Sequence, residues 1–491
     1  MPSDTFIQSL ISPQRSQLSF HPQFLEQLNP KSEKIAILAT NEFEGFSKNG
    51  GIGTYYTALS EKLAGENWLI ILLLCQSEEP FQGVSKTPNV DRVFSAGEVA
   101  TVLQLQPIHE AILAHTQENG VSQSFDADSF CCLFFTQAIA TAFPQAVIYV
   151  EFPVIWGFGY RTLQAKRAGL LGNHCLLGVT DHGGFEWLRE TNSRYKIDYP
   201  QWFWQAYHYE QYSYEQADLT CFPSYFLKSK VEGYGWKTAH AVHLPYFIPL
   251  LDLSPQPLAQ PDNDKISVIF FGRLEERKGL CSFVEALQLL ESDWAKKIEI
   301  LFLGRIISLE STALKGLDSQ AYIDRQLQGK FSYQILPDLF SQEALELVNH
   351  LPHPIVCLCS LQENFPNAAL EMGQLPVSLV VSNTGGFQET LDLIARTEGL
   401  RWFEPGDAYS LAGRLRESML AYPETPAAPD RSLLEQTNKK LLNQRLELMS
   451  EAFLQSAPNP PENTSHYYRC HRQFRSPTSC RVSREFSRTN L

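Results

Sequence analysis

The sequence lacks the features that define several large classes of protein. No apolar stretch approaches the roughly 18 residues that a membrane-spanning helix needs. The first thirty residues lack the charged, then apolar, then small pattern of a secretory signal. The formal net charge of −14 argues against a nucleic-acid-binding protein. We therefore expect a soluble protein of the cytoplasm.

Cysteine spacing also excludes some kinds of site. The ten cysteines are scattered, with no C-x-x-C pair and no paired histidine spacing. Cys131 and Cys132 lie in one apolar run, and Cys357 and Cys359 lie in another. Buried thiols are ordinary in such runs. The sequence thus predicts neither a structural zinc site nor a disulfide framework, and we expect no metal and a reducing compartment.

The length and composition favour a large protein with more than one core. The chain has 491 residues, of which 44% are hydrophobic and 12% aromatic, so more than one domain is expected. A proline-rich, polar segment over 254–264 has the composition of a linker. We predict an N-terminal extension (1–32), a first domain (33–250), the linker (251–264), a second domain (265–425), a helix that returns to the first domain (426–456) and a disordered basic tail (457–491).

Short apolar runs alternate with helical patterns on both sides of this linker, and each run is typical of a buried parallel strand. Before the linker the predicted strands are 34–39, 68–75, 131–135, 146–150 and 176–179. After it they are 266–271, 298–303, 333–336, 355–359 and 378–381. This alternation predicts an α/β protein of two doubly wound, Rossmann-like domains that face each other across a cleft.

Two carboxylates stand eight positions apart in the segment ENFPNAALE. Glu363 is expected in a loop, and Glu371 in the helix that this loop opens, with Pro366 at the first helical position. Such a pair can hold two separated parts of one elongated ligand, with helix N–H groups between them that favour an anion. Taken alone, the pair is more often a helix cap and a solvated carboxylate.

A basic turn follows the predicted strand 266–271. It reads Gly-Arg273-Leu-Glu-Glu-Arg-Lys278-Gly, and a helical pattern follows it. A strand, a glycine, a cluster of cations and a helix form a phosphate site at the carboxyl edge of a parallel sheet. Arg273 can bind phosphate oxygens with its guanidinium fork, and Lys278 with a mobile point charge. The alternative is a solvated turn, since Glu275 and Glu276 lie among the cations.

The first half carries a glycine turn and a histidine at predicted strand ends. Lys48-Asn-Gly50-Gly51 precedes a helical pattern and can approach a phosphate or a sugar closely, or can be a tight turn without a ligand. His182 follows the predicted strand 176–179 and is either a catalytic or a structural residue. The aromatic-rich segment 199–214 favours a packed helix over a platform for an acceptor sugar.

Taken together, FGRLEERKG, ENFPNAALEMGQLPV and NTGGFQE resemble the donor half of retaining glycosyltransferases with the two-domain GT-B fold, most closely family 4. The lysine and glycine loop is also similar to that of starch and glycogen synthases. The resemblance implies that Arg273 and Lys278 bind the nucleotide diphosphate. It implies that Glu363 and Asn364 contact the transferred sugar, that Glu371 binds the ribose, and that Gly50, Gly51 and His182 face the donor.

The activity that the resemblance implies is a metal-independent hexosyl transfer with retention at the anomeric carbon. A nucleotide-diphosphate sugar is the co-substrate, and the acceptor is a sugar, a lipid-linked molecule or a small molecule. A nucleotide-sugar epimerase or phosphorylase on the same fold, and a nucleotide-sugar-binding protein without turnover, stay open as alternatives. The tail over 457–491 has six arginines and two glutamates, which allows at most a peripheral contact with the inner membrane face.

Overall fold

The structure is a computed structural model. It describes residues 18–28, 33–46, 50–105, 107–118, 124–192, 201–252, 265–309, 311, 313–421 and 426–455. The predicted basic tail and most of the predicted linker lie outside these residues. Within them, no helix is both long enough and apolar enough to cross a bilayer.

The chain divides into two compact units that do not follow it as two continuous blocks. The first unit contains residues 1–180, 199–220 and 448–491, and the second contains 181–198 and 221–447. His182 therefore belongs to the same unit as Arg273, Lys278 and Glu363. Gly50 and Gly51 belong to the other unit.

Most strands of the first unit belong to a seven-stranded sheet with the order β4-β3-β2-β6-β7-β8-β9. Every pair with a described register is parallel. The strands are β2 (Lys34–Thr40), β3 (Leu69–Leu74), β4 (Arg92–Ser95), β6 (Val147–Pro153), β7 (Cys175–Thr180), β8 (Leu219–Phe222) and β9 (Val242–His243). A separate antiparallel pair joins β1 (Ser19–Phe20) to β5 (Leu103–Gln104).

Helices connect these strands, as parallel pairing requires. They are α2 (Pro22–Leu25), α3 (Gly51–Gly65), α4 (Val99–Val102), α5 (Pro107–Glu118), α6 (Ser124–Ala142), α7 (Tyr160–Arg167), α8 (Phe185–Asn192), α9 (Gln201–Gln216) and α10 (Tyr225–Gly233), with a 3-10 turn η1 (Ile155–Gly157). The aromatic-rich segment forms α9, so the prediction of a packed helix is confirmed.

The second unit contains a six-stranded, all-parallel sheet with the order β12-β11-β10-β13-β14-β15. Its strands are β10 (Ile266–Phe271), β11 (Ile298–Leu303), β12 (Tyr333–Leu336), β13 (Ile355–Leu358), β14 (Ser378–Ser382) and β15 (Leu400–Phe403). The strand order reverses between β10 and β13. Ligands of doubly wound sheets bind at this point, beyond the carboxyl ends of the strands.

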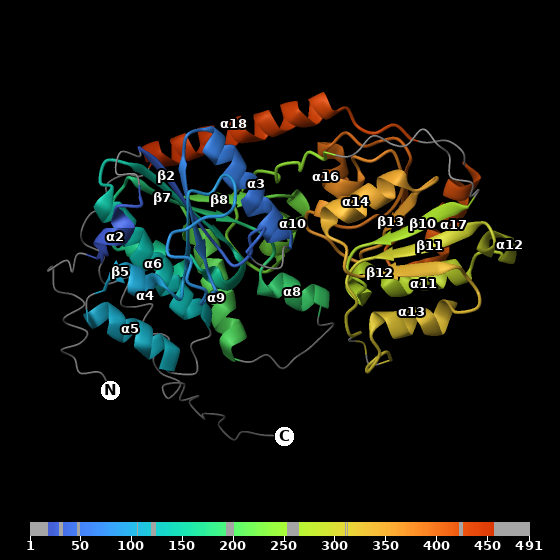
Figure 1. The fold of residues 1–491 in the computed structure, drawn as a ribbon, viewed down its shortest axis with the longest axis horizontal. Coiled ribbons are helices and arrows are strands. Elements are labelled where there is room, and N and C mark those ends of the chain that lie inside the picture. Colours follow the sequence, from blue (N-terminus) through green and yellow to red (C-terminus); the bar gives the residue numbers. More distant parts are fainter. Residues whose placement is uncertain are drawn as a thin grey trace, which may run out of the picture. The chain divides into compact units, whose positions relative to one another are not determined.

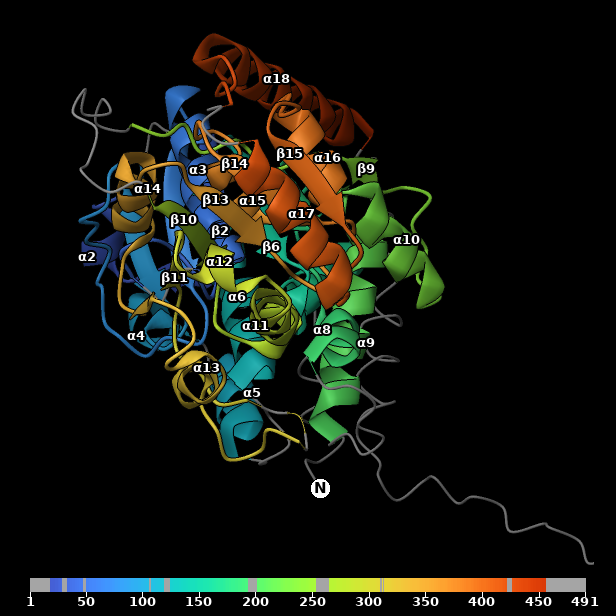
Figure 2. The same cartoon turned by 90° about the vertical axis from the view of Figure 1, so that its right-hand side faces the viewer.

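Helices cover both faces of this sheet (Figure 1). Those of one face share a single apolar core with the sheet, and Figure 2 shows α11 and α17 side by side. Members of that core are Val268 and Phe270 on β10, Phe283 on α11, Ile323 on α13 and Leu411 on α17. The helices that follow β10 in the chain are α11 (Leu280–Gln288), α12 (Ser292–Ala295), α13 (Ser319–Leu327), α14 (Ser341–His350), α15 (Asn367–Met372), α16 (Phe387–Leu393) and α17 (Ala408–Leu420), with a 3-10 turn η2 (Glu276–Lys278). The last helix, α18 (Arg431–Gln455), is divided between the two units.

One predicted strand is wrong. Residues 131–135 lie in the middle of α6 and not in a strand. This helix is buried on almost every face, so it has no polar stripe with a period of 3.6 residues. A short apolar run from such a helix cannot be distinguished by periodicity from a buried strand.

Helix α18 is attached to the segment that follows β9. The side chain of Asn438 accepts from the Ile248 N–H and donates to the Ile248 carbonyl, both at 2.8 Å. Gln444 donates to the His243 carbonyl at 3.2 Å, and Arg431 donates to the Leu251 carbonyl at 2.6 Å. Both Asn438 and Ile248 are buried, so the Asn438 amide and the Ile248 backbone groups supply each other with the hydrogen bonds that water cannot provide.

We expect Asn438→Ala to lower the free energy of unfolding by roughly 2–3 kcal/mol, because two buried backbone groups lose their partner. Hydrogen–deuterium exchange at Ile248 should become faster, and chemical denaturation gives the energy. Gln436→Ala, at an exposed position of the same helix, is the control and should stay within about 0.5 kcal/mol. Unchanged exchange at Ile248 would show that α18 does not hold this segment.

Candidate functional site

The two central strand ends of the second sheet carry the sequence motifs. The basic turn leaves β10 at Gly272, and the loop with Glu363 leaves β13 after Leu358. The Leu361 N–H donates to the Arg277 carbonyl at 2.8 Å, so the two loops are joined through their backbones. The strand order therefore brings together residues that are about ninety positions apart in the sequence.

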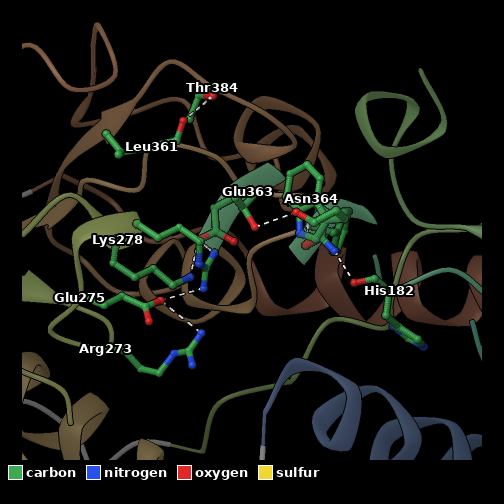
Figure 3. Close-up of polar contacts among 12 residues, drawn as sticks. His182, Arg273, Glu275, Lys278, Leu361, Glu363, Asn364 and Thr384 are labelled. Carbon is green, nitrogen blue, oxygen red and sulfur yellow. Dashed lines mark hydrogen bonds and ion pairs between the residues drawn. The ribbon is translucent and has the colours of Figure 1, made fainter. Parts of the chain in front are cut away.

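Three cations and two carboxylates meet between these loops (Figure 3). Lys278 Nζ pairs with Glu363 Oε1, and Arg277 Nη1 lies 3.6 Å from the same oxygen. Glu275 Oε1 binds Arg277 Nη2 at 2.8 Å and Arg273 Nη2 at 3.2 Å. The side chain of Arg273 is 55% exposed, whereas Glu363 is only 6% exposed. Three positive and two negative charges leave one net positive charge in this group.

The charges in the group support one another. Burial alone would raise the pKa of Glu363, but Lys278 and Arg277 outweigh it and hold that pKa below its ordinary value. Burial lowers the pKa of Lys278, and the nearby Glu363 carboxylate opposes the change. Glu363 is therefore an ionised carboxylate at neutral pH, although it is buried.

Three glycines let the loops pack this closely. Gly279 has φ +78° and Gly385 has φ +60°, both in the left-handed region that favours glycine. A Cβ on Gly279 would lie 1.9 Å from the Cys359 carbonyl oxygen. On Gly385 it would lie 1.9 Å from the Glu363 carbonyl oxygen, and on Gly386 1.8 Å from that of Asn364. The close approach is thus between two parts of the chain itself.

The second carboxylate of the pair lies where the sequence predicts it. Glu371 is the fifth residue of α15, and Ser341 Oγ donates to it at 3.2 Å. Burial raises the pKa of Glu371 to about 7, and the Ser341 hydrogen bond opposes the rise. The helix begins at Asn367, with Pro366 as the N-cap residue, so the prediction that Pro366 is the first helical residue is off by one position.

His182 follows the end of β7, as predicted, and lies within the second unit. Its Nδ1 is 2.5 Å from the Tyr246 hydroxyl. Burial, with help from the charge of Arg445, lowers the pKa of His182 to about 3, so its imidazole is neutral at neutral pH. Asp181 accepts from the Gly183 N–H at 2.8 Å and thereby shapes the turn. Burial raises the pKa of Asp181 to about 7.

Asn364 connects His182 to the Glu363 loop. Its Nδ2 donates to the His182 carbonyl at 2.6 Å, and its Oδ1 accepts from the Phe365 N–H at 2.6 Å (Figure 3). The Ser224 hydroxyl donates to the Asn364 carbonyl at 2.7 Å. In this structure the amide of Asn364 therefore serves to shape the site.

The glycine turn of the first unit is at the N-terminus of α3, with Gly50 as the N-cap and Gly51 as the first helical residue. Glu42 Oε2 accepts from the Gly50 N–H at 3.1 Å and from the Gly53 N–H at 3.4 Å. A carboxylate of the chain itself therefore occupies the donors that a phosphate would use. Lys48 lies outside the described residues.

Sequence reasoning did not assign functions to three residues at this site. Arg277 was hidden in a run of charges, yet it contacts both Glu275 and Glu363. Tyr246 lies in a stretch without a motif, and nothing in the sequence connects it to His182. Glu389 accepts from the Tyr225 and Phe226 N–H groups at 2.7 and 3.0 Å, so it caps α10. Its place in the NTGGFQE motif was the only signal.

The described part of the chain contains no group of three or more His, Cys, Asp or Glu side chains that could hold a metal ion. The clustered charges at the site are three cations and two carboxylates, with one positive charge in excess. The arrangement can offer positive charge from Arg273 and Lys278 to the phosphates of a ligand. It can also offer a carboxylate, from Glu363 or Glu371, to hydroxyl groups of a ligand.

Residues 256–429 match the family model described as Glycosyl transferases group 1, and this match indicates a glycosyltransferase. The matched range contains both loops described above. No curated protein matches the chain.

Solved structures are similar to nearly the whole chain at low identity. A sucrose-phosphate synthase from Thermosynechococcus elongatus is 15% identical, with a TM-score of 0.54 over 90% of this chain and 98% of that one. The catalytic domain of starch synthase IV from Arabidopsis thaliana is 11% identical, with a TM-score of 0.55 over 86% and 100%. A glycosyltransferase from Rickettsia africae is 13% identical, with a TM-score of 0.51 over 86% and 100%. The protein has the GT-B fold, with two Rossmann-like domains, as the sequence predicts.

We expect Gly385→Ala to lower the free energy of unfolding by at least about 2 kcal/mol, since its Cβ meets a backbone carbonyl and its φ is left-handed. Gly413→Ala is the matched control, because a Cβ there meets nothing within 4 Å inside α17. That substitution should stabilise the helix by up to about 1 kcal/mol. Denaturant unfolding of both variants gives the comparison, and equal effects would contradict the role given to Gly385.

Proposed function

We propose that this protein transfers a sugar from a nucleotide-diphosphate sugar to the hydroxyl of an acceptor, with retention at the anomeric carbon and without a metal ion. The observation that carries the proposal is the ionised Glu363 that faces Lys278 and Arg277 where the strand order reverses. Hydroxyl groups of a sugar suit a carboxylate, and a diphosphate suits the neighbouring cations.

Departure of the nucleoside diphosphate is the step that requires positive charge. Arg273 is mostly exposed and forms an ion pair with Glu275, so it can turn its guanidinium to phosphate oxygens at little cost. Lys278 has three donors and can keep Glu363 while it contacts a second oxygen. Charges preorganised in this way stabilise the leaving group more than water would.

The remaining residues position the donor. Glu363 binds hydroxyls of the transferred sugar, Glu371 binds the ribose, and Asn364 holds the Glu363 loop against His182. His182 is neutral and contacts the transferred sugar through hydrogen bonds, not as a cation. Gly50 and Gly51, in the first unit, keep the donor-binding role that the sequence predicts. No carboxylate is assigned as a covalent nucleophile, so the acceptor attacks from the face that the diphosphate leaves, and the diphosphate assists its deprotonation.

The first test is a panel of UDP-, GDP- and ADP-sugars with candidate acceptors, in which nucleoside diphosphate is measured. We expect its release with one donor only when an acceptor is present, with undiminished rate in a chelator. The anomeric configuration of the product, read by NMR, tests retention. An isomerised nucleotide sugar without diphosphate release would overturn the transferase and favour an epimerase, and release of a sugar phosphate would favour a phosphorylase.

Arg273→Ala is the sharpest variant for the leaving-group step, because the exposed side chain contributes little to stability. We expect kcat/KM to fall about a hundredfold while the unfolding energy stays within about 0.5 kcal/mol. Arg325→Ala, at an exposed arginine of α13, is the matched control and should keep full activity. Equal activities of the two variants would remove Arg273 from the leaving-group step.

Donor affinity should depend on pH through Glu371. Burial raises the pKa of Glu371 to about 7, and ribose hydroxyls donate to its ionised form. Affinity for a nucleotide sugar should therefore rise up to about tenfold per pH unit below pH 7 and level off above it. Calorimetry between pH 5.5 and 8.5 measures this, and the diphosphate of a nucleotide sugar does not itself titrate there.

Two variants separate Glu371 from other groups, because Asp181 also has a pKa of about 7. In Glu371→Gln the increase of donor affinity with pH should disappear. In Ser341→Ala the increase of donor affinity should occur at higher pH, since the hydrogen bond that favours the ionised carboxylate is lost. An unchanged pH dependence in Glu371→Gln would remove Glu371 from the donor site.

A further inference from the structure

His182 is held at two points, by Asn364 of the Glu363 loop and by Tyr246, which lies in no sequence motif. Its main-chain carbonyl accepts from Asn364, and its ring nitrogen Nδ1 lies 2.5 Å from the Tyr246 hydroxyl. Asn364 directly follows Glu363, so one of the two holds comes from the loop with the buried carboxylate. The other comes from a tyrosine 64 positions further along the chain.

The ring of Tyr246 has aromatic neighbours on two sides. It lies 5.2 Å from the His182 ring at an interplanar angle of 42°, and 4.9 Å from the Phe365 ring at 65°. Tyr246 and Phe365 are each 4% exposed. Phe365 is two positions after Glu363, so the ring that packs on Tyr246 belongs to the same loop as the buried carboxylate.

The segment that carries Tyr246 is itself fixed. Asn438 of α18 binds both backbone groups of Ile248, two residues away, and Gln444 binds the carbonyl of His243. Tyr246 therefore cannot shift without disturbing several buried hydrogen bonds. These bonds hold the backbone on both sides of Tyr246, whose hydroxyl meets the His182 ring.

We propose that Tyr246 is a positioning residue for sugar transfer: with Phe365 packed on its ring, it sets the orientation and the tautomer of His182 relative to the Glu363 loop. This inference rests on the proposed function. The Tyr246 hydroxyl donates to Nδ1, so the imidazole proton resides on Nε2. The Asp181 carbonyl, at 3.4 Å, is a more distant acceptor for the same hydroxyl.

In this arrangement one loop both binds the transferred sugar and orients the histidine. Glu363, Asn364 and Phe365 are consecutive, and the last two contact His182 directly or through Tyr246. A donor that binds Glu363 therefore finds His182 already oriented. Preorganisation of this kind acts on kcat more than on donor binding, because it matters most in the transition state.

Tyr246→Phe is the test, because it removes the hydroxyl and keeps the ring that packs on Phe365. We expect kcat for sugar transfer to fall about ten- to a hundredfold, with KM for the donor within about twofold. In a His182→Ala background the same substitution should change kcat less than twofold, because Tyr246 acts through that histidine. Equal losses in both backgrounds would overturn the proposal.

A spectroscopic measurement tests the tautomer without any turnover. In ¹⁵N-histidine spectra the His182 signals, assigned by their loss in His182→Gln, should show a pyrrole-type Nε2 and a pyridine-type Nδ1. Tyr246→Phe should change this pattern. Tyr333→Phe, which removes a hydroxyl bound to Asp324 at 2.7 Å elsewhere in the same unit, should not.

The conservative variant Phe365→Tyr should retain most of the activity, since it keeps an aromatic ring against Tyr246, and Phe365→Leu should not. A protonated Nδ1 in the unmodified protein would contradict the proposed tautomer. If no donor is turned over by the unmodified protein, the proposed function fails. The histidine spectra would still decide whether Tyr246 orients His182.

Discussion

The site depends on keeping one buried carboxylate ionised. Glu363 is almost inaccessible to water, and a carboxylate in such surroundings loses its charge unless cations face it. Lys278 and Arg277 supply them, but they come from the loop after another strand. The basic turn must therefore pack against the backbone of the Glu363 loop, which requires glycine at 279, and the turn after β14 packs on the same loop through glycines 385 and 386. The need to keep Glu363 ionised thus restricts the size of the side chain at the glycine positions.

The fold of the second unit could be predicted largely from the sequence. Strands β10, β11 and β12 have the predicted bounds, and β10 is a nearly continuous apolar run, as expected of a strand covered by helices on both faces. The same signal failed for 131–135, since α6 is also apolar on nearly every side. β4 and β15 were not predicted, because Arg92–Ser95 and Leu400–Phe403 are short and each contains an arginine.

The site could be predicted only motif by motif. Arg273, Lys278, Glu363 and Glu371 were each identified, but their pairing follows from the strand order, which local patterns do not contain. Tyr246 could not be found in this way. It lies in no helix or strand, and its partners His182 and Phe365 are 64 and 119 positions away. Contacts made by tertiary structure alone leave no periodic signal in a single sequence.

The two glycine turns of the chain differ in what they can bind. In the second unit the basic turn presents Arg273, a largely exposed cation, so an anion can bind without displacing a buried group. In the first unit Glu42 already occupies the N–H groups of Gly50 and Gly53. A phosphate there would face a carboxylate and be repelled, whereas a hydroxyl could donate to Glu42. The turn at Gly50 is therefore better suited to a hydroxyl than to a phosphate, whereas the basic turn with Arg273 and Lys278 suits an anion.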